Sequence, residues 1–170
     1  MVAASSSLPK AMLRAGIQSG SIMAAADTVT QLQIEHRSTW DARRTTRWAT
    51  AGLFLHGPYF CAGFVQIDRY FGMATSFSNV IKKTLTAQIV LFGPYLAMLF
   101  GFLGWMEGHP NIQQKVQQQV PDAFIVGAFY WPVANSLNFA LVPPSLRVPY
   151  LATAAGLWNG YLSWSNARQG

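Results

Sequence analysis

Four long stretches without a charged residue decide what this chain can fold into. They cover residues 49–67, 84–106, 123–146 and 148–167, and charged residues flank each of them. A helix rises about 1.5 Å per residue, so roughly 20 residues cross the hydrocarbon core of a bilayer. In water, four such stretches would expose large apolar surfaces and aggregate. The sequence therefore predicts an all-α integral membrane protein, a helical bundle with transmembrane helices over these four ranges.

The low share of charged residues supports the same class. Of the 170 residues, 51% are hydrophobic and only 11% are charged, whereas an ordinary soluble domain carries about 25% charged residues. That share is too small to cover a water-soluble core with a polar surface. The length predicts a single membrane domain, residues 1–170.

A helix is also predicted over residues 9–35, but its place relative to the bilayer is open. The segment 15–34 is long enough to span, although it contains Asp27 and several polar residues. It is either a fifth transmembrane helix or an amphipathic helix that lies along the membrane interface.

Three of the predicted spans contain a proline close to their middle, at Pro58, Pro94 and Pro132. Each proline removes one helical hydrogen bond, and in lipid the freed carbonyl needs a partner in a neighbouring helix or a water. We therefore expect kinked helices that pack as a bundle. The kinks either improve packing or, as in transporters, break helices that line a polar cavity near the bilayer midplane.

Polar residues inside the apolar segments are the candidate site. Asp27 and Gln31 are four residues apart and share a helix face, so in a bundle they point inward together. A carboxylate that faces lipid costs about 2.5 kcal/mol or more, so a cationic partner is expected, and Arg147 between the last two spans is the candidate. The group acts either as a structural clamp or in gating. Further intramembrane polar residues are Gln88, Asn135 and Asn138, which serve as interhelical hydrogen-bonding groups or line a polar path near Asp27.

The basic residues predict lipid contacts. The formal net charge is +6, and five basic residues that flank the apolar stretches suit anionic headgroups: Arg43, Arg44, Arg47, Lys82 and Lys83. No basic face or known motif points to nucleic acid, so no nucleic-acid partner is expected.

No catalytic, cofactor or metal site is expected. Cys61 is the single cysteine, which excludes an internal disulfide. The chain has no glycine-rich phosphate loop, no HExxH motif and no serine nucleophile elbow. The sequence therefore predicts a protein that is not an enzyme.

The carboxyl-terminal third carries a specific resemblance. It contains Pro121-Asp122, Trp131-Pro132, Asn138-Phe139, Val142-Pro143, Arg147 and the run from Trp158 to Trp164. This pattern resembles the signature of the Mpv-seventeen / peroxisomal membrane protein twenty-two family, here called the Mpv/PMP family. The resemblance implies a small multi-helix protein of the mitochondrial inner membrane or, alternatively, of the peroxisomal membrane, with a role in channel-like permeability or organelle homeostasis.

Two functions follow as hypotheses. The first is a channel or permeability-modulating protein whose proline-broken helices enclose a polar path. The second is a structural accessory subunit bound to a larger membrane complex, such as a respiratory-chain complex. The expected partners are membrane lipids, together with that larger complex or further copies of the chain.

Overall fold

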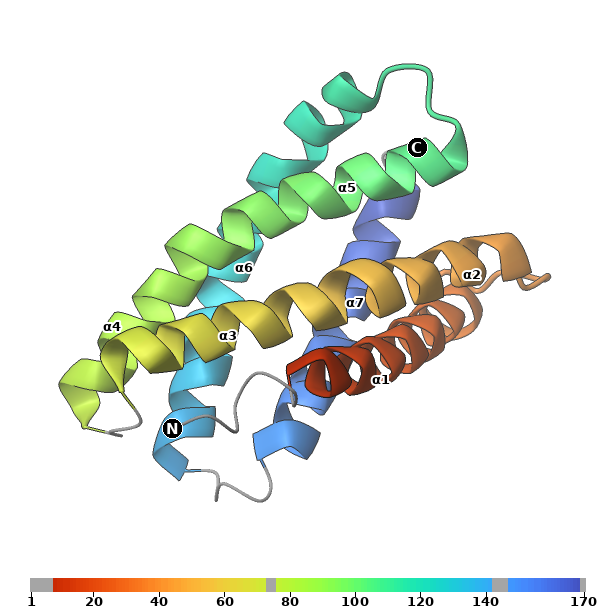
Figure 1. Cartoon of the computed structure of the whole chain (residues 1–170). Helices are drawn as coiled ribbons and strands as arrows, with labels where there is room; N and C mark the ends of the chain where they lie inside the picture. Colours follow the sequence, from red (N-terminus) through yellow and green to blue (C-terminus); the bar gives the residue numbers. More distant parts are fainter. Residues whose placement is uncertain (1–7, 73–75, 142–146, 169–170) are drawn as a thin grey trace.

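The fold is all-helical, as the sequence predicts. The computed structural model describes residues 8–72, 76–141 and 147–168, and every element within these ranges is a helix (Figure 1). In chain order the elements are α1 (Leu8–Val29), η1 (Thr30–Ile34), α2 (Ala42–Ala51), η2 (Gly52–His56), α3 (Gly57–Phe71), α4 (Phe77–Thr86), η3 (Ala87–Phe92), α5 (Gly93–Glu107), α6 (Ile112–Leu141) and α7 (Arg147–Arg168), where η marks a π-helical segment.

Local signals in the sequence set several helix ends. Asp41 caps α2, because its side chain accepts a hydrogen bond from the Arg44 backbone N–H at 3.0 Å. Gly72 and Gly108 follow α3 and α5 with φ angles of 76° and 68°. Residues with a Cβ avoid these angles, so glycine lets the chain leave both helices sharply.

Two long helices form the centre of the bundle, and each contains a π-helical segment followed by Gly-Pro-Tyr. One runs from Ala42 to Phe71 through η2, and the other runs from Phe77 to Glu107 through η3. They run antiparallel, since α3 packs against α4 while α2 packs against α5 (Figure 1). Pro58 and Pro94 lie in the first turn of α3 and α5, directly after the π-helical segments. The wider π turn accommodates a proline that cannot donate a hydrogen bond backward.

The predicted spans all fall within described helices, apart from residues 142–146, which lie outside the described residues. Among the described helices, one continuous helix, Phe77–Glu107, is long and apolar enough to cross a membrane by length and composition, with a mean hydropathy of 1.8 over an 18-residue stretch. Four expectations stay predictions: that the other three stretches cross the membrane, that α1 crosses it, that residues 1–170 form a single domain, and that the helices bend at Pro58, Pro94 or Pro132.

The core lies where these two long helices meet the remaining three helices. α1 packs against α2, η2, α3 and α7, while α6 covers α5 and contacts α7 (Figure 1). The buried apolar cluster consists of Met23, Trp48, Ala51, Phe92, Tyr95, Leu96, Leu99, Phe100, Leu103, Ala123, Trp158 and Leu162. Because these residues come from α1, α2, η3, α5, α6 and α7, one core joins the whole described bundle.

Small residues bring α1 unusually close to the first long helix. A Cβ atom placed on Gly52 would lie 2.7 Å from the Cα and N atoms of Gly20, which is closer than real Cβ contacts. A Cβ on Gly57 would meet the backbone of Ala15 and Gly16. This contact is backbone against backbone, so neither helix can yield without moving as a whole.

We predict that Gly52→Ala lowers the free energy of unfolding by about 1–3 kcal/mol, because the added methyl group forces α1 and η2 apart. Gly101→Ala is the matched control, since its Cβ would meet Val116 at an ordinary 3.8 Å. Unfolding in mild detergent, followed by circular dichroism, measures both. Equal stability of the two variants would contradict the close packing of α1.

Candidate functional site

A buried ion cluster lies where α1, η1, α2 and α7 meet, with Arg44 at its centre. Asp27 is 0% exposed and Arg44 is 5% exposed. Arg44 Nε lies 2.8 Å from Asp27 Oδ1. The other two guanidinium nitrogens donate to the two carboxylate oxygens of Glu35 at 2.8 and 2.9 Å. One cation thus bridges two acids through a bidentate contact, which is the strongest geometry for such a pair.

Uncharged side chains donate the remaining hydrogen bonds to the Asp27 carboxylate. Thr45 Oγ1 and Gln31 Nε2 donate to Asp27 Oδ2 at 2.7 and 2.8 Å. The hydroxyl of Ser163 in α7 donates to Asp27 Oδ1, and its oxygen accepts from Arg44 at 2.9 Å. We define the ion cluster as Asp27, Gln31, Glu35, Arg44, Thr45 and Ser163.

The charges of this region shift two pKa values. Burial alone would lower the pKa of Arg44, but the hydrogen bonds with Glu35 and the charge of Asp27 raise it above its ordinary value. The hydrogen bond from the backbone N–H of Arg44 lowers the pKa of Asp41. Both side chains are therefore fully ionised at neutral pH.

The cation that the structure places on Asp27 is Arg44, whereas Arg147 was the partner predicted from the sequence. The side chain of Arg147 lies outside the described residues, so its own contacts stay a prediction. The buried face of α2 carries the signal that points to Arg44. Arg44, Thr45, Trp48 and Ala51 follow one another at intervals of one, three and three residues, which places them on one inward face.

The structure also divides the basic residues that were expected to contact lipid headgroups. Arg44 is buried in the ion cluster, and Lys83 is buried in an ion pair with Asp68 at 2.5 Å. Arg43 and Lys82 are exposed and Arg47 is half-buried. Headgroup contacts therefore stay a prediction that rests on Arg43, Arg47 and Lys82.

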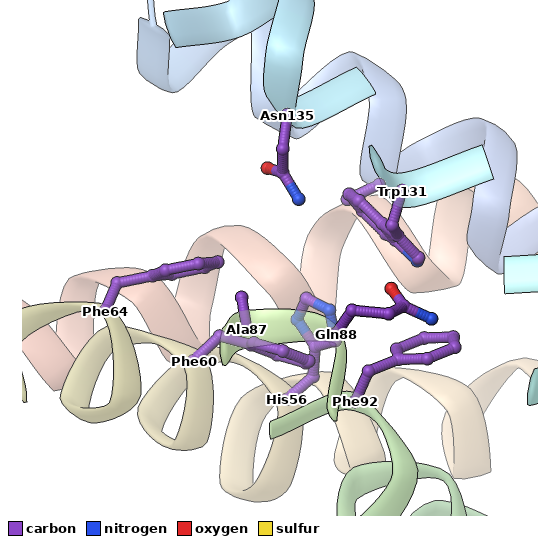
Figure 2. Close-up of a pocket in the computed structure, with 9 residues that line it drawn as sticks. His56, Phe60, Phe64, Ala87, Gln88, Phe92, Trp131 and Asn135 are labelled. Carbon is purple, nitrogen blue, oxygen red and sulfur yellow. The ribbon is translucent and has the colours of Figure 1, made fainter. Parts of the chain in front are cut away.

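A separate cavity of about 90 Å³ lies in the interior between the two long helices, α6 and α7 (Figure 2). Its wall consists of His56, Phe60, Phe64, Ala87, Gln88, Phe92, Trp131, Asn135 and Ala155. Each π-helical segment contributes one polar residue, because η2 ends in His56 and η3 contains Gln88. π-helical turns occur frequently at functional sites, and here they aim polar groups at the cavity.

Polar groups in this wall lack protein partners. Gln88 is 8% exposed, and its Nε2 has no hydrogen-bond partner among the described residues. The indole Nε1 of Trp131 is likewise buried without a partner. Figure 2 shows the Gln88 amide extending toward Trp131 and Phe92, with the Asn135 amide on the opposite side of the cavity. An unpaired buried polar group costs about 1–3 kcal/mol, so a hydrogen-bond acceptor that reached either N–H group would offset that cost.

A wider recess of about 270 Å³ adjoins the cavity and shares His56, Phe60, Phe64 and Ala155 with it. Asn159 of α7 lines this recess; it is 1% exposed, and neither atom of its amide has a partner among the described residues. Ser19 of α1 also lines the recess, and its hydroxyl lies 3.0 Å from His56 Nδ1. One water needs roughly 10–15 Å³ of such space, so each hollow is large enough for several waters.

The predicted site residues thus separate into two places. Gln88 and Asn135 line the cavity together, whereas Asp27 and Gln31 belong to the ion cluster. The side chain of Asn138 lies outside the described residues. His56 and Asn159 were not among the predicted site residues. In the described part of the chain, no three His, Cys, Asp or Glu side chains come together as a metal site.

Comparison with known proteins identifies the family. The model of the Mpv17 / PMP22 family matches residues 104–163. The Mitochondrial inner membrane protein Mpv17 of Danio rerio is 30% identical over 153 residues, which cover 87% of this chain and 85% of that protein. The chain belongs to the Mpv17 / PMP22 family. This is the Mpv/PMP family that the signature resembles.

Further relatives agree over most of their length. The Drosophila melanogaster Mpv17 is 31% identical over 162 residues, 91% of this chain and 95% of the relative. The human Mpv17 is 28% identical over 156 residues, 89% and 88% of the two chains. These relatives are mitochondrial inner membrane proteins, and this family member has the same location. No solved structure matches the chain.

We predict that Arg44→Met destabilises the protein by about 3–5 kcal/mol, because Asp27 then remains buried without its cation, while the half-buried Glu35 keeps only the exposed Arg37. Arg43→Met is the matched control, since Arg43 is the exposed neighbour in the same helix. Thermal unfolding in mild detergent compares the two variants with the wild type. A small and equal effect of both substitutions would show that the ion cluster contributes little to stability.

Proposed function

We propose that this family member is a non-enzymatic, channel-like protein of the mitochondrial inner membrane, in which solutes pass through the cavity and the adjoining recess. The observation that carries the proposal is the group of buried polar side chains without protein partners, Gln88, Trp131 and Asn159. They come from η3, α6 and α7; Gln88 and Trp131 line the cavity, and Asn159 lines the adjoining recess.

The exterior of the described bundle supports a lipid environment on several helices. Phe54, Ile89, Phe129 and Leu157 are 71%, 68%, 76% and 69% exposed. These residues lie on η2, η3, α6 and α7, each inside a predicted span. Large apolar side chains that face outward at these depths are stable in hydrocarbon and unfavourable in water. We therefore propose that all four predicted spans cross the bilayer.

The interior of the bundle contains polar side chains, whereas its exterior is apolar. In hydrocarbon each polar group needs a partner within the protein or a water-filled cavity. The ion cluster meets this requirement through its own contacts, whereas the cavity meets it only with an occupant. A backbone that departs from the α-helix is tolerated in a membrane where it lines such a cavity. The π-helical segments η2 and η3 both line this cavity.

The alternative function is an accessory subunit that packs its apolar exterior against a larger membrane complex. The exposed apolar side chains would suit an accessory subunit equally well. An accessory subunit, however, has no use for the unpartnered polar groups of the cavity. Native gels of mild-detergent extracts separate the two, since an accessory subunit migrates with the large complex.

We predict that liposomes containing the purified protein release small entrapped solutes faster than protein-free liposomes. Ala155→Phe should abolish most of this release, because Ala155 lines both the cavity and the recess. Leu157→Phe is the matched control two residues along α7, since Leu157 faces outward. Liposomes that stay as tight as protein-free ones, with insertion of the protein verified, would refute the channel-like function.

A further inference from the structure

An open groove of about 500 Å³ lies on the outside of the bundle between α1 and α7, here called the α1–α7 groove. Its mostly apolar wall includes Ile22, Ala25, Val29, Gly156, Leu157 and Gly160. Val29 and Leu157 are 54% and 69% exposed. No charged side chain of the described residues lines the groove. An apolar wall that is open to the outside suits a hydrocarbon chain.

The two glycines of this wall are already used inside the fold. A Cβ atom on Gly156 would lie 3.4 Å from Ile22 Cγ2, and one on Gly160 would lie 3.4 Å from Thr30 Oγ1. The Thr30 hydroxyl also lies 3.3 Å from the Gly160 carbonyl oxygen, to which it donates. Glycines four residues apart let two membrane helices approach closely. Here the helix that approaches is α1 of the same chain, so the spacing does not call for a helix from a second copy.

One face of α7 leads from the groove to the end of the helix. Leu157, Tyr161, Trp164 and Arg168 follow one another at intervals of four, three and four residues, which places them on one face. The rings of Tyr161 and Trp164 lie 6.2 Å apart, and the guanidinium carbon of Arg168 lies 4.7 Å from the centre of the Trp164 ring. Aliphatic, aromatic and cationic side chains follow in this order from hydrocarbon to headgroups in membrane helices.

Arg168 is the cation available to a headgroup at this end of the groove. Among the described residues no acid forms an ion pair with it. Arg37, which follows the α1 wall of the groove, is by contrast paired with Glu35 at 3.3 Å. Asp122 of α6 is close enough for its charge to act on Tyr161, but it does not line the groove. A phosphate beside Arg168 would therefore meet a cation that the fold leaves without an acid.

From this arrangement we propose that the α1–α7 groove binds an anionic phospholipid, with one acyl chain in the groove and the phosphate at Arg168. The predicted span 148–167 ends one residue before Arg168, which places this side chain among the headgroups. Helix geometry puts Leu157 about 16 Å deeper than Arg168, within the hydrocarbon. The inference goes beyond the channel-like function, because the groove lies on the outside of the bundle and requires no solute path.

Native mass spectrometry tests the headgroup contact, because it counts the lipids that each protein molecule retains. The protein in mild detergent is mixed with equal amounts of phosphatidylglycerol and phosphatidylcholine that carry the same acyl chains and differ in charge. We expect the protein to retain one phosphatidylglycerol in preference to phosphatidylcholine. Arg168→Gln should lower this preference about fivefold, which is the effect of one cation near an anionic lipid surface. Arg69→Gln is the matched control, since Arg69 is an exposed cation on α3 outside the groove.

A second variant tests the place of the acyl chain. Ala25 is exposed and lines the groove, so the ring of Ala25→Phe fills the groove without entering the core. We expect this variant to lose most of the retained phosphatidylglycerol. Val133→Phe is its control, because it adds a ring at a 59% exposed position of α6 outside the groove. Circular dichroism verifies that each variant keeps its helix content.

Three results would overturn the inference. The first is equal retention of the two lipids by the wild type. The second is an equal loss of preference in Arg168→Gln and Arg69→Gln, because net charge alone would then explain the preference. The third is a dimer that Ala25→Phe dissociates, since the groove would then belong to a second copy of the chain. The channel-like function is tested separately by solute release from liposomes, so either proposal can fail without the other.

Discussion

Every polar group that a helix carries into hydrocarbon needs a partner inside the protein, because lipid tails offer none. The described structure answers this constraint in two ways. In the ion cluster, Arg44 faces both Asp27 and Glu35, and Thr45, Gln31 and Ser163 complete the contacts of the Asp27 carboxylate. In the cavity and the adjoining recess, by contrast, Gln88 Nε2 and both amide atoms of Asn159 have no protein partner among the described residues. The first arrangement is closed and fixes helices, whereas the second leaves room for a solute.

Both long helices line the cavity at the same backbone feature, a π-helical segment followed by Gly-Pro-Tyr. Gly57-Pro58-Tyr59 and Gly93-Pro94-Tyr95 each follow a π-helical segment. The rings of Tyr59 and Tyr95 stack with centroids 5.9 Å apart, and Tyr59 Oη donates to the Leu91 carbonyl at 3.0 Å. These contacts tie the two interruptions together. The close packing of α1 at Gly52 and Gly57 holds the first long helix from the other side. His56 and Gln88 are thereby fixed on one cavity, although neither is held by a charge.

Sequence alone was enough for the all-helical class and the family, because long uncharged stretches and the Trp131-Pro132 and Trp158–Trp164 motifs are local features. It offered Gln88 and Asn135 either as interhelical hydrogen-bonding groups or as the lining of a polar path near Asp27, and in the described structure both line the cavity. It did not find Arg44 as the partner of Asp27. A cluster of basic residues beside an apolar stretch is equally typical of headgroup contacts, and only the packing of α2 against α1 and α7 separates Arg44 from the exposed Arg43. Separation of Asp27 from the cavity likewise depends on tertiary packing, which no spacing along the chain encodes.

The proposed function requires that water or a solute occupies the cavity and the recess while the protein lies in a bilayer. Water-edited solid-state NMR of the lipid-reconstituted protein measures this most directly, because magnetisation passes from mobile water to nearby side chains. We expect the side-chain amides of Gln88 and Asn159 to receive magnetisation almost as fast as exposed Gln114, and far faster than the buried methyl groups of Leu99. If these two amides respond as slowly as Leu99, the cavity and the recess are dry and no solute path runs through them.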